Sequence, residues 1–546
     1  MKTVADLLLA RAEDDNPGLL FEDRVWTWRE VVQASAERAH LLAELRPEGP
    51  FHVGLLLDNV PEFVFLLGAA ALAGAAVVGI NPTRRGAELE RDIRFADCGI
   101  LITEDKHRPL LQDIETGVGP ERCFGVETVR WRESLAPHAG RSAPQIDFDP
   151  LAPFLLIFTS GTTGDPKAAL CSQLRCASIG EMGGKIRDLT PRDVLYQAMP
   201  MFHSNALFAG WAPALAWGTG FAMRRRFSAS GFLPDVRKFG ATQANYVGKP
   251  LSYVLATPER PDDADNPLTL AFGNEGAVHD IERFERRFGC KVRESYGSTE
   301  GGVAISRDAD TPLNALGKAG DVAILDPDTG EECPPARFDA AGKLANADEA
   351  VGEIVNLRSA PTFEGYWKNA EANTERTHDG IYWTGDLGYR DQRGYIYFAG
   401  RGFDWLRVDG ENFAAAPLER ILVRHPDVSL ACVYAVPDAQ VGDQVMAALI
   451  LEAGARFEPG GFAEFLASQA DLGTKWTPRY VRVSESLPST ETNKILKRVL
   501  RRQRWECDDP VWLRDSEGNF RPLTPEDAAR IRSEFAARGR ESALEG

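Results

Sequence analysis

Residues 154–171 read FLLIFTSGTTGDPKAALC, two apolar runs joined by a loop of small and hydroxyl-bearing residues that ends in a lysine. The runs 154–158 and 168–171 predict two buried strands. Small residues let backbone N–H groups approach phosphate oxygens, hydroxyls add donors, and the lysine adds charge. The spacing Gly-x-x-x-x-Gly-Lys-Ser/Thr is absent, so this is not a Walker loop. The predicted phosphate contacts are Thr159, Ser160, Gly161, Thr162, Thr163, Gly164 and Lys167.

Outward from this loop, short apolar runs alternate with helical patterns, which predicts a layered α/β architecture. The expected strands are 53–57, 76–80, 154–158, 244–247, 268–272 and 292–295, with a helix at 281–288. After residue 400 the pattern changes to a helix at 417–424, strands at 431–436 and 445–451, and a helix near 462–469. We therefore predict a large multi-layer α/β domain, residues 1–400, in which helices flank β-sheets. A smaller, mobile α+β domain, residues 401–546, follows it.

Composition is that of a soluble globular protein, with 44% hydrophobic and 26% charged residues. The chain has 62 Lys and Arg against 80 Asp and Glu, a formal net charge of −18. Such a field repels phosphate backbones, so nucleic acid is not an expected partner. Eight cysteines stand singly, without metal-ligand spacing, and the N-terminus lacks the features of a signal peptide. These features predict a cytoplasmic protein with reduced thiols.

Residues 63–80 form a stretch of 18 residues without a charge, the threshold length for a transmembrane helix. The stretch is rich in Ala and Gly and runs into Asn81-Pro82. We interpret it as a buried helix followed by the strand 76–80. Peripheral membrane contact stays open, as does a homodimer.

Two further motifs accompany the phosphate loop, Tyr296-Gly297-Ser298-Thr299-Glu300 and Tyr382-Trp383-Thr384-Gly385-Asp386. In this order the three motifs resemble the adenylate-forming (AMP-binding) superfamily of acyl-CoA synthetases, peptide-synthetase adenylation domains and luciferases. The resemblance covers about residues 26–525. Finer detail is similar to the fatty acid transport protein and very-long-chain acyl-CoA synthetase branch, on the segments 225–230, 246–248, 273–274, 410–412 and 490–494.

The resemblance implies an ATP-dependent acyl-CoA ligase for a hydrophobic carboxylic acid, either a long-chain fatty acid or a steroid side-chain acid. Such an enzyme forms acyl-AMP and pyrophosphate, then acyl-CoA and AMP. ATP, Mg²⁺ and coenzyme A are the implied cofactors and co-substrates. The basic clusters 224–226 and 494–504 are either anion contacts or solvated faces.

The resemblance also assigns roles, in a reaction that joins two anions and needs charge neutralised. Glu300 would bind Mg²⁺, with Thr159 as a second contact, since both offer hard oxygen ligands. Tyr296 would stack on adenine and Gly297 would let the backbone approach, beside Ser298 and Thr299. In the third motif, Asp386 would accept the ribose hydroxyls, and Arg401 would add a donor.

His203 matches a segment that lies near the acyl carboxylate and ATP in this superfamily, although a packed core histidine is the plainer interpretation. The loop 273–276, with Gly273, Asn274 and Glu275, resembles the border of the adenine and acyl pocket. Residues 206–217 would line that pocket, and core packing predicts the same apolar residues.

Lys494 would come from the small domain to the α-phosphate and carboxylate during adenylation. The superfamily rotates this domain between its two half-reactions, which predicts a hinge just after Arg401. Two residues beyond it, where many relatives carry Asp or Lys, this chain has Phe403, so the hinge residue is Phe403 or Asp404.

Two alternatives stay open. One is an acyl-AMP ligase that loads a carrier protein in place of free coenzyme A. The other is a lipid uptake or binding module with a vestigial ATP site, against which the joint presence of Glu300, Asp386 and Lys494 argues.

Overall fold

The computed structural model describes the chain apart from residues 1, 160–166, 249, 275, 277, 309, 313, 328, 340–343, 359–361, 402–404, 409–410, 440–442, 470–471, 473–474, 490–494, 539–540 and 545–546. The chain forms two compact units. The first contains Met1–Gly302 and Ala360–Glu375, and the second contains Val303–Ser359 and Arg376–Gly546. The domain boundary predicted between residues 400 and 401 falls inside the second unit and stays a prediction.

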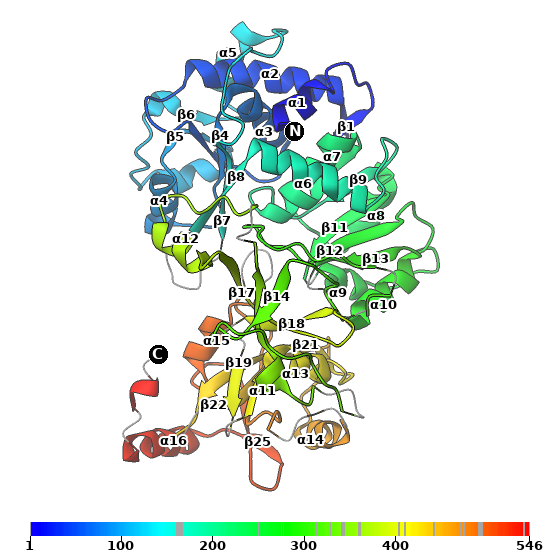
Figure 1. The fold of residues 1–546 in the computed structure, drawn as a ribbon, viewed down its shortest axis with the longest axis vertical. Coiled ribbons are helices and arrows are strands. Elements are labelled where there is room, and N and C mark those ends of the chain that lie inside the picture. The colour runs from blue at the N-terminus through cyan, green and yellow to red at the C-terminus, as the bar shows by residue number, and fades with distance from the viewer. Residues whose placement is uncertain are drawn as a thin grey trace. The chain divides into compact units, whose positions relative to one another are not determined.

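The first unit contains two mostly parallel sheets (Figure 1). The seven-stranded sheet has the order β13-β12-β11-β9-β10-β1-β2. Its strands are β1 (Pro17–Phe21), β2 (Arg24–Thr27), β9 (Val194–Gln197), β10 (Gly220–Met223), β11 (Gln243–Val247), β12 (Leu270–Asn274) and β13 (Lys291–Glu294). Apart from the antiparallel pair β1–β2, the described strand pairs of this sheet are parallel.

The six-stranded sheet has the order β6-β5-β3-β4-β7-β8. Its strands are β3 (His52–Leu56), β4 (Ala76–Gly79), β5 (Cys98–Thr103), β6 (Cys123–Gly125), β7 (Pro153–Thr159) and β8 (Lys167–Ser172). Here β7 and β8 form the antiparallel hairpin that carries the predicted phosphate loop. The strands predicted in this part of the chain are confirmed to within two residues at each end, and so is the α/β fold class.

Helices connect and cover these strands, and their ends follow local sequence signals. They include α1 (Val4–Leu9), α2 (Trp28–Glu44), α3 (Pro61–Ala73), α4 (Gly86–Phe95), α5 (Val129–Leu135), α6 (Gln173–Ile186), α7 (Ala212–Trp217), α8 (Phe232–Phe239), α9 (Pro250–Leu255), α10 (Val278–Phe288) and the π-helix η4 (Asn205–Trp211). Helix α2 begins with a reciprocal capping box between Thr27 and Glu30, which satisfies backbone N–H groups at the helix start. Helix α3 contacts both α1 and α2, and all three contribute to the largest apolar cluster of this unit.

The uncharged stretch 63–80 is a buried helix followed by a strand, as predicted. Helix α3 has Pro61 at its first turn and ends at Gly74, whose φ of 69° is left-handed, and β4 begins two residues later. The 13 residues of α3 span about 20 Å, less than the roughly 30 Å of a bilayer core. Among the described residues, no helix combines the length and the apolar character that crossing a bilayer requires.

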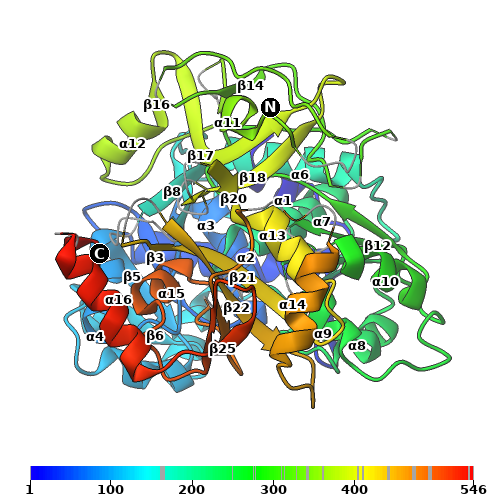
Figure 2. The ribbon, with the colours of Figure 1, turned by 90° about the horizontal axis from the view of Figure 1, so that it is seen from below.

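The second unit contains three sheets and the C-terminal helices (Figure 2). One sheet has the order β14-β15-β17-β16, with β18 paired to β17; a two-stranded sheet is β19-β20; the third has the order β21-β22-β23-β24-β25. The strands are β14 (Val322–Leu325), β15 (Gly352–Asn356), β16 (Thr377–His378), β17 (Ile381–Arg390), β18 (Ile396–Arg401), β19 (Trp405–Val408), β20 (Glu411–Ala414), β21 (Val428–Pro437), β22 (Asp443–Leu451), β23 (Tyr480–Val483), β24 (Val511–Arg514) and β25 (Phe520–Pro522). The helices are α11 (Ala347–Ala350), α13 (Ala415–Leu422), α14 (Pro459–Ser468), α15 (Lys497–Gln503) and α16 (Pro525–Ala537).

The stretch 431–436 of strand β21 is continuously apolar and does not alternate between apolar and polar residues, because both faces of its sheet are buried. Val433 and Ala435 pack into one apolar cluster, whereas Cys432, Tyr434 and Val436 pack into another. Successive side chains of a strand point to opposite faces, so both faces of this sheet are covered. The predicted helix–strand–strand–helix pattern after residue 415 is confirmed.

Candidate active site

The seven-stranded sheet contains a topological switch point. After β9 the chain continues to β10 on one side, and after β11 it continues to β12 on the other. In open parallel sheets, ligands bind outside the carboxyl ends of the strands at such a point. The predicted residue His203 follows β9, Gly273 and Asn274 end β12, and Tyr296 follows β13. We call this place the β9–β11 switch point.

The described ends of the phosphate hairpin are Thr159 and Lys167. They are register partners, and the Thr159 hydroxyl donates to the carbonyl oxygen of Lys167 at 3.3 Å. Lys167 Nζ lies 3.4 Å from Glu375 Oε2 and 5.9 Å from the ring centre of Tyr366. The predicted contacts Ser160, Gly161, Thr162, Thr163 and Gly164 lie outside the described residues. A strand, β8, follows the loop directly, as the sequence predicts.

The motif 296–300 follows β13 and is held from three directions. The Thr299 hydroxyl hydrogen-bonds the Ser204 hydroxyl at 2.7 Å, and Arg175 donates to the Thr299 carbonyl at 2.7 Å. The Tyr366 hydroxyl donates to Glu300 Oε1 at 2.9 Å. Because Ser204 is the neighbour of His203, the structure brings the His203 segment and the Glu300 motif side by side.

Within the same motif, the Ser298 hydroxyl donates to the Gly301 carbonyl at 3.1 Å, which closes the turn after Glu300. Among the described residues, a Cβ added at Gly297 would meet no atom within 4 Å. Packing therefore does not require glycine at 297, whereas close approach of a ligand to the backbone would.

His203 lies in the connection that leaves β9, with its ring centre 4.4 Å from that of Phe202. Burial lowers the pKa of His203 to about 4, so the imidazole is neutral at pH 7. It can exchange hydrogen bonds with a bound anion, but it supplies no full positive charge before an anion binds. Charge neutralisation must come from other groups.

Asn59 fixes the segment that carries His203. Its amide nitrogen donates to the carbonyls of Met199 and Arg224, both at 3.0 Å, and its oxygen accepts from the Met201 N–H at 2.8 Å. The Gln197 side chain also donates to the Met199 carbonyl, at 2.8 Å. The backbone before His203 is thus held at a fixed place relative to the end of β9.

Gly273 has a packing reason, because a Cβ there would lie 2.3 Å from the Tyr246 carbonyl oxygen. The next residue, Asn274, has a buried Oδ1 that finds no hydrogen-bond donor among the described residues, and the same holds for Asn205 and Asn245. Buried acceptors without partners are rare in folded proteins. A ligand or ordered water at this end of the sheet would supply donors to them; Glu275 lies outside the described residues.

In the second unit, Asp386 lies on β17 and is 7% exposed. Its register partner is Arg401, the last residue of β18, so the two residues predicted to bind one ribose are opposite each other in an antiparallel pair. Lys494 and the hinge candidates Phe403 and Asp404 lie outside the described residues.

The structure assigns internal partners to the arginine triplet. Arg224 pairs with Asp235 at 3.1 Å, Arg225 with Glu104, and Arg226 with Asp58 at 3.2 Å. Neither of the two interpretations from the sequence, an anion contact or a solvated face, includes these internal ion pairs.

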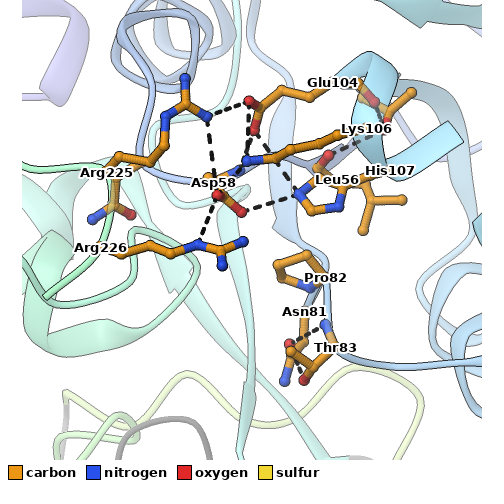
Figure 3. A network of polar contacts seen from close by, with 12 residues as sticks. Leu56, Asp58, Asn81, Pro82, Thr83, Glu104, Lys106, His107, Arg225 and Arg226 are labelled. Carbon is orange, nitrogen blue, oxygen red and sulfur yellow. Dashed lines mark hydrogen bonds and ion pairs between the residues drawn. The ribbon is translucent and has the colours of Figure 1, made fainter.

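The last two pairs belong to a network that Figure 3 shows, in which Lys106 and His107 also contact Asp58. Asp58 follows β3 and Glu104 follows β5. They lie at the corresponding switch point of the six-stranded sheet, which we call the β3–β5 switch point.

Sequence reasoning missed the segment 362–375, which returns to the first unit. Its residue Thr362 accepts a hydrogen bond from the Gly302 N–H at 3.0 Å, and Tyr366 binds Glu300. The local signal is an aromatic pair after Gly365 in a polar stretch, which by itself is also typical of a surface turn. Only the folded chain brings this segment to the motif 296–300.

Comparison with known proteins agrees with these features. The family model described as AMP-binding enzyme matches residues 9–367, and the model described as AMP-binding enzyme C-terminal domain matches residues 417–494. The chain is 50% identical to a steroid-22-oyl-CoA synthetase of Rhodococcus jostii, over 99% of both chains. It is also 50% identical to a medium/long-chain-fatty-acid–CoA ligase, FadD17, of Mycobacterium tuberculosis, over 93% of this chain and 98% of the other.

Among solved structures, an anthranilate CoA ligase, AuaEII, in complex with anthranoyl-AMP superposes with a TM-score of 0.81. It is 21% identical, over 92% of this chain and 96% of that one. This likeness concerns the fold.

Proposed function

The chain belongs to the AMP-binding enzyme family and is an AMP-forming acid–thiol ligase, and we propose that its substrate is a long-chain fatty acid or a steroid side-chain acid. The observation that carries the site assignment is the position of the motif 296–300. Ser204 ties this motif to the His203 segment, and Tyr366 ties it to the phosphate hairpin through Lys167. These contacts support the proposal of a single ATP site within the first unit.

The substrate class rests on the two 50%-identical relatives and on the apolar residues that follow His203. The π-helix η4 continues directly from Ser204 and contributes Ala206, Leu207 and Trp211 to the apolar core of the unit, and helix α7 follows it. π-helical turns are frequent at functional sites. Peripheral membrane contact and a homodimer stay predictions.

In the first half-reaction, a carboxylate oxygen of the acid attacks the α-phosphorus of ATP, and pyrophosphate leaves. Glu300 and Thr159 would hold Mg²⁺; a carboxylate and a hydroxyl are the hard oxygen ligands that this ion prefers, so the residues fit it. When bound, the ion offsets negative charge on the phosphates. Lys167 adds a positive charge beside the loop, and neutral His203 hydrogen-bonds the reacting anions.

In the second half-reaction, the thiol of coenzyme A attacks the acyl carbonyl carbon of the adenylate, and AMP leaves with the electrons of the broken C–O bond. Asp386 and Arg401 would hold the ribose, and Lys494 would serve adenylation alone. Such a division of labour requires the small domain to turn between the steps, with the hinge near Phe403 or Asp404.

The half-reactions of Lys494→Ala test this proposal. We expect acyl-adenylate formation to fall by at least ~10²-fold, because one electrostatic stabiliser of the transition state is lost. Thioester formation from supplied acyl-adenylate should continue. The measurement is single-turnover kinetics of each half-reaction, with a panel of fatty and steroid acids as substrates for the wild type.

Three results would contradict parts of the proposal. Equal loss in both half-reactions would make Lys494 structural. Pyrophosphate release without acyl-CoA formation would favour transfer to a carrier protein, and no pyrophosphate release with any acid would favour a lipid-binding module.

A further inference from the structure

We infer that Tyr366 is a positioning residue for Glu300, whose carboxylate its hydroxyl orients toward the magnesium ion. The hydroxyl donates to Glu300 Oε1 at 2.9 Å, and Oε2 accepts no hydrogen bond from the part of the chain that the structure describes. This inference rests on the proposed role of Glu300 as a metal ligand. Ligating carboxylates commonly need such an outer hydrogen bond to hold their orientation.

The position of Tyr366 is itself fixed by backbone pairing. The N–H of Leu170 on β8 donates to the Gly365 carbonyl, and the N–H of Trp367 donates to the Ala168 carbonyl, both at 2.9 Å. The N–H of Tyr366 donates to Asn373 Oδ1 at 2.7 Å, and the residue is 3% exposed. The hydroxyl therefore has little freedom to leave Glu300.

The same side chain lies beside the phosphate hairpin. Its ring centre is 5.9 Å from Lys167 Nζ, on the strand that pairs with residues 365–367. Since β8 carries both Lys167 and the pairing partner of Tyr366, a shift of the hairpin would move the tyrosine and the carboxylate with it. Tyr366 thus fixes the distance between the loop that would hold the phosphates and the residue that would hold the metal.

The variant Tyr366→Phe isolates this role, because it removes the hydroxyl and keeps the ring beside Lys167. We expect Mn²⁺, used as a probe for Mg²⁺, to bind the enzyme–ATP complex about 10–100-fold more weakly, the usual loss on removing an outer hydrogen bond of a metal ligand. Electron paramagnetic resonance of free Mn²⁺ measures this affinity without turnover.

The matched control is Tyr196→Phe. Tyr196 is buried in the same unit, and its hydroxyl donates to a carboxylate oxygen of Asp235 at 3.1 Å. This control loses the same kind of hydrogen bond and should keep the wild-type Mn²⁺ affinity. Equal weakening in both variants would overturn the inference, because it would show a general structural effect.

The variant Glu300→Gln distinguishes the inference from the proposed function. If Tyr366 acts through Glu300, adding Tyr366→Phe to Glu300→Gln should weaken Mn²⁺ binding by less than about twofold, since the two changes remove one interaction. A full additional loss would overturn the inference. If Glu300→Gln weakens binding and Tyr366→Phe does not, the inference alone falls. If neither changes it, the metal role of Glu300 falls as well.

Discussion

The two mostly parallel sheets of the first unit have the same kind of switch point, but the side chains at the two points differ. At the β3–β5 switch point, Asp58 and Glu104 meet Lys106, Arg225 and Arg226 (Figure 3). At the β9–β11 switch point, the amide oxygens of Asn205, Asn245 and Asn274 have no donor among the described residues. One place is filled by the chain's own charges, and the other keeps unmet hydrogen-bonding capacity. The topology provides two candidate sites, and the chain's own ion pairs occupy one of them.

The arginines at the β3–β5 switch point of the six-stranded sheet come from the seven-stranded sheet. Arg225 and Arg226 follow the end of β10, and the Asp58 and Glu104 carboxylates are 5% and 2% exposed. Burial alone would raise the pKa of Asp58, but hydrogen bonds from His107, Lys106 and Arg226 outweigh it and hold the pKa below its usual value. The network therefore ties the two sheets together at their carboxyl ends. It should affect stability far more than catalysis.

The largest expected effect is at the filled switch point. Asp58→Asn should lower the free energy of unfolding by about 3 kcal/mol, because it leaves cations without their buried partner. This is the lower end of the usual range, since the Lys106 and Arg226 side chains are 38% and 72% exposed and can turn to solvent. Urea unfolding measures the change.

At a temperature where Asp58→Asn stays folded, its rate of pyrophosphate release should remain within about threefold of the wild type, a difference below 1 kcal/mol. The exposed variant Asp23→Asn, which removes a surface partner of Lys238, is the control for loss of one ion pair. One result would contradict this prediction: Asp58→Asn and the control lose equally little free energy of unfolding, and Asp58→Asn nevertheless loses activity. The β3–β5 switch point would then serve catalysis and not stability.

The second effect is at the β9–β11 switch point, where we propose the ligand site. Glu300→Ala should lower the adenylation rate by at least ~10²-fold, about 2.7 kcal/mol in the barrier, with a raised Mg²⁺ requirement. Its unfolding midpoint should stay near that of the wild type, because Glu300 is part-exposed and makes its described hydrogen bond through one oxygen. Near-normal turnover with unchanged magnesium dependence would remove Glu300 from the metal site.

The sequence predicted the strands well, because strands depend on local patterns; the roles of the motif 296–300 stay predictions. The run 154–158 is apolar throughout, which predicts a buried strand. The loop after it is rich in small and hydroxyl-bearing residues, a composition typical of phosphate-binding loops. Asp58 and Tyr366 were not predicted, since their partners lie 168 and 66 residues away, at Arg226 and Glu300. One sequence does not show which charged residues will meet across two sheets. Lys494 depends on a domain position that neither the sequence nor the described residues fix.

The smallest expected effect is the pH dependence that His203 brings to the ligand site. Burial lowers the pKa of His203 to about 4, from the usual value of about 6.5, so the unfolded chain binds the proton more readily than the folded one. The stability that this group contributes is complete above pH 6.5 and is lost as the pH falls toward 4. Because the pKa of Asp58 is lowered below 3.8, the Asp58 carboxylate stays ionised throughout this window. When the pH is lowered from 7.5 to 5, His203→Gln should therefore gain about 1–2 kcal/mol of unfolding free energy relative to the wild type.

Urea unfolding of both proteins at the two pH values measures this gain, and the contributions of other titrating groups cancel in the difference. A constant difference between the two proteins would mean that His203 is as easily protonated in the folded chain as in the unfolded one, and that this switch point admits charge without a ligand.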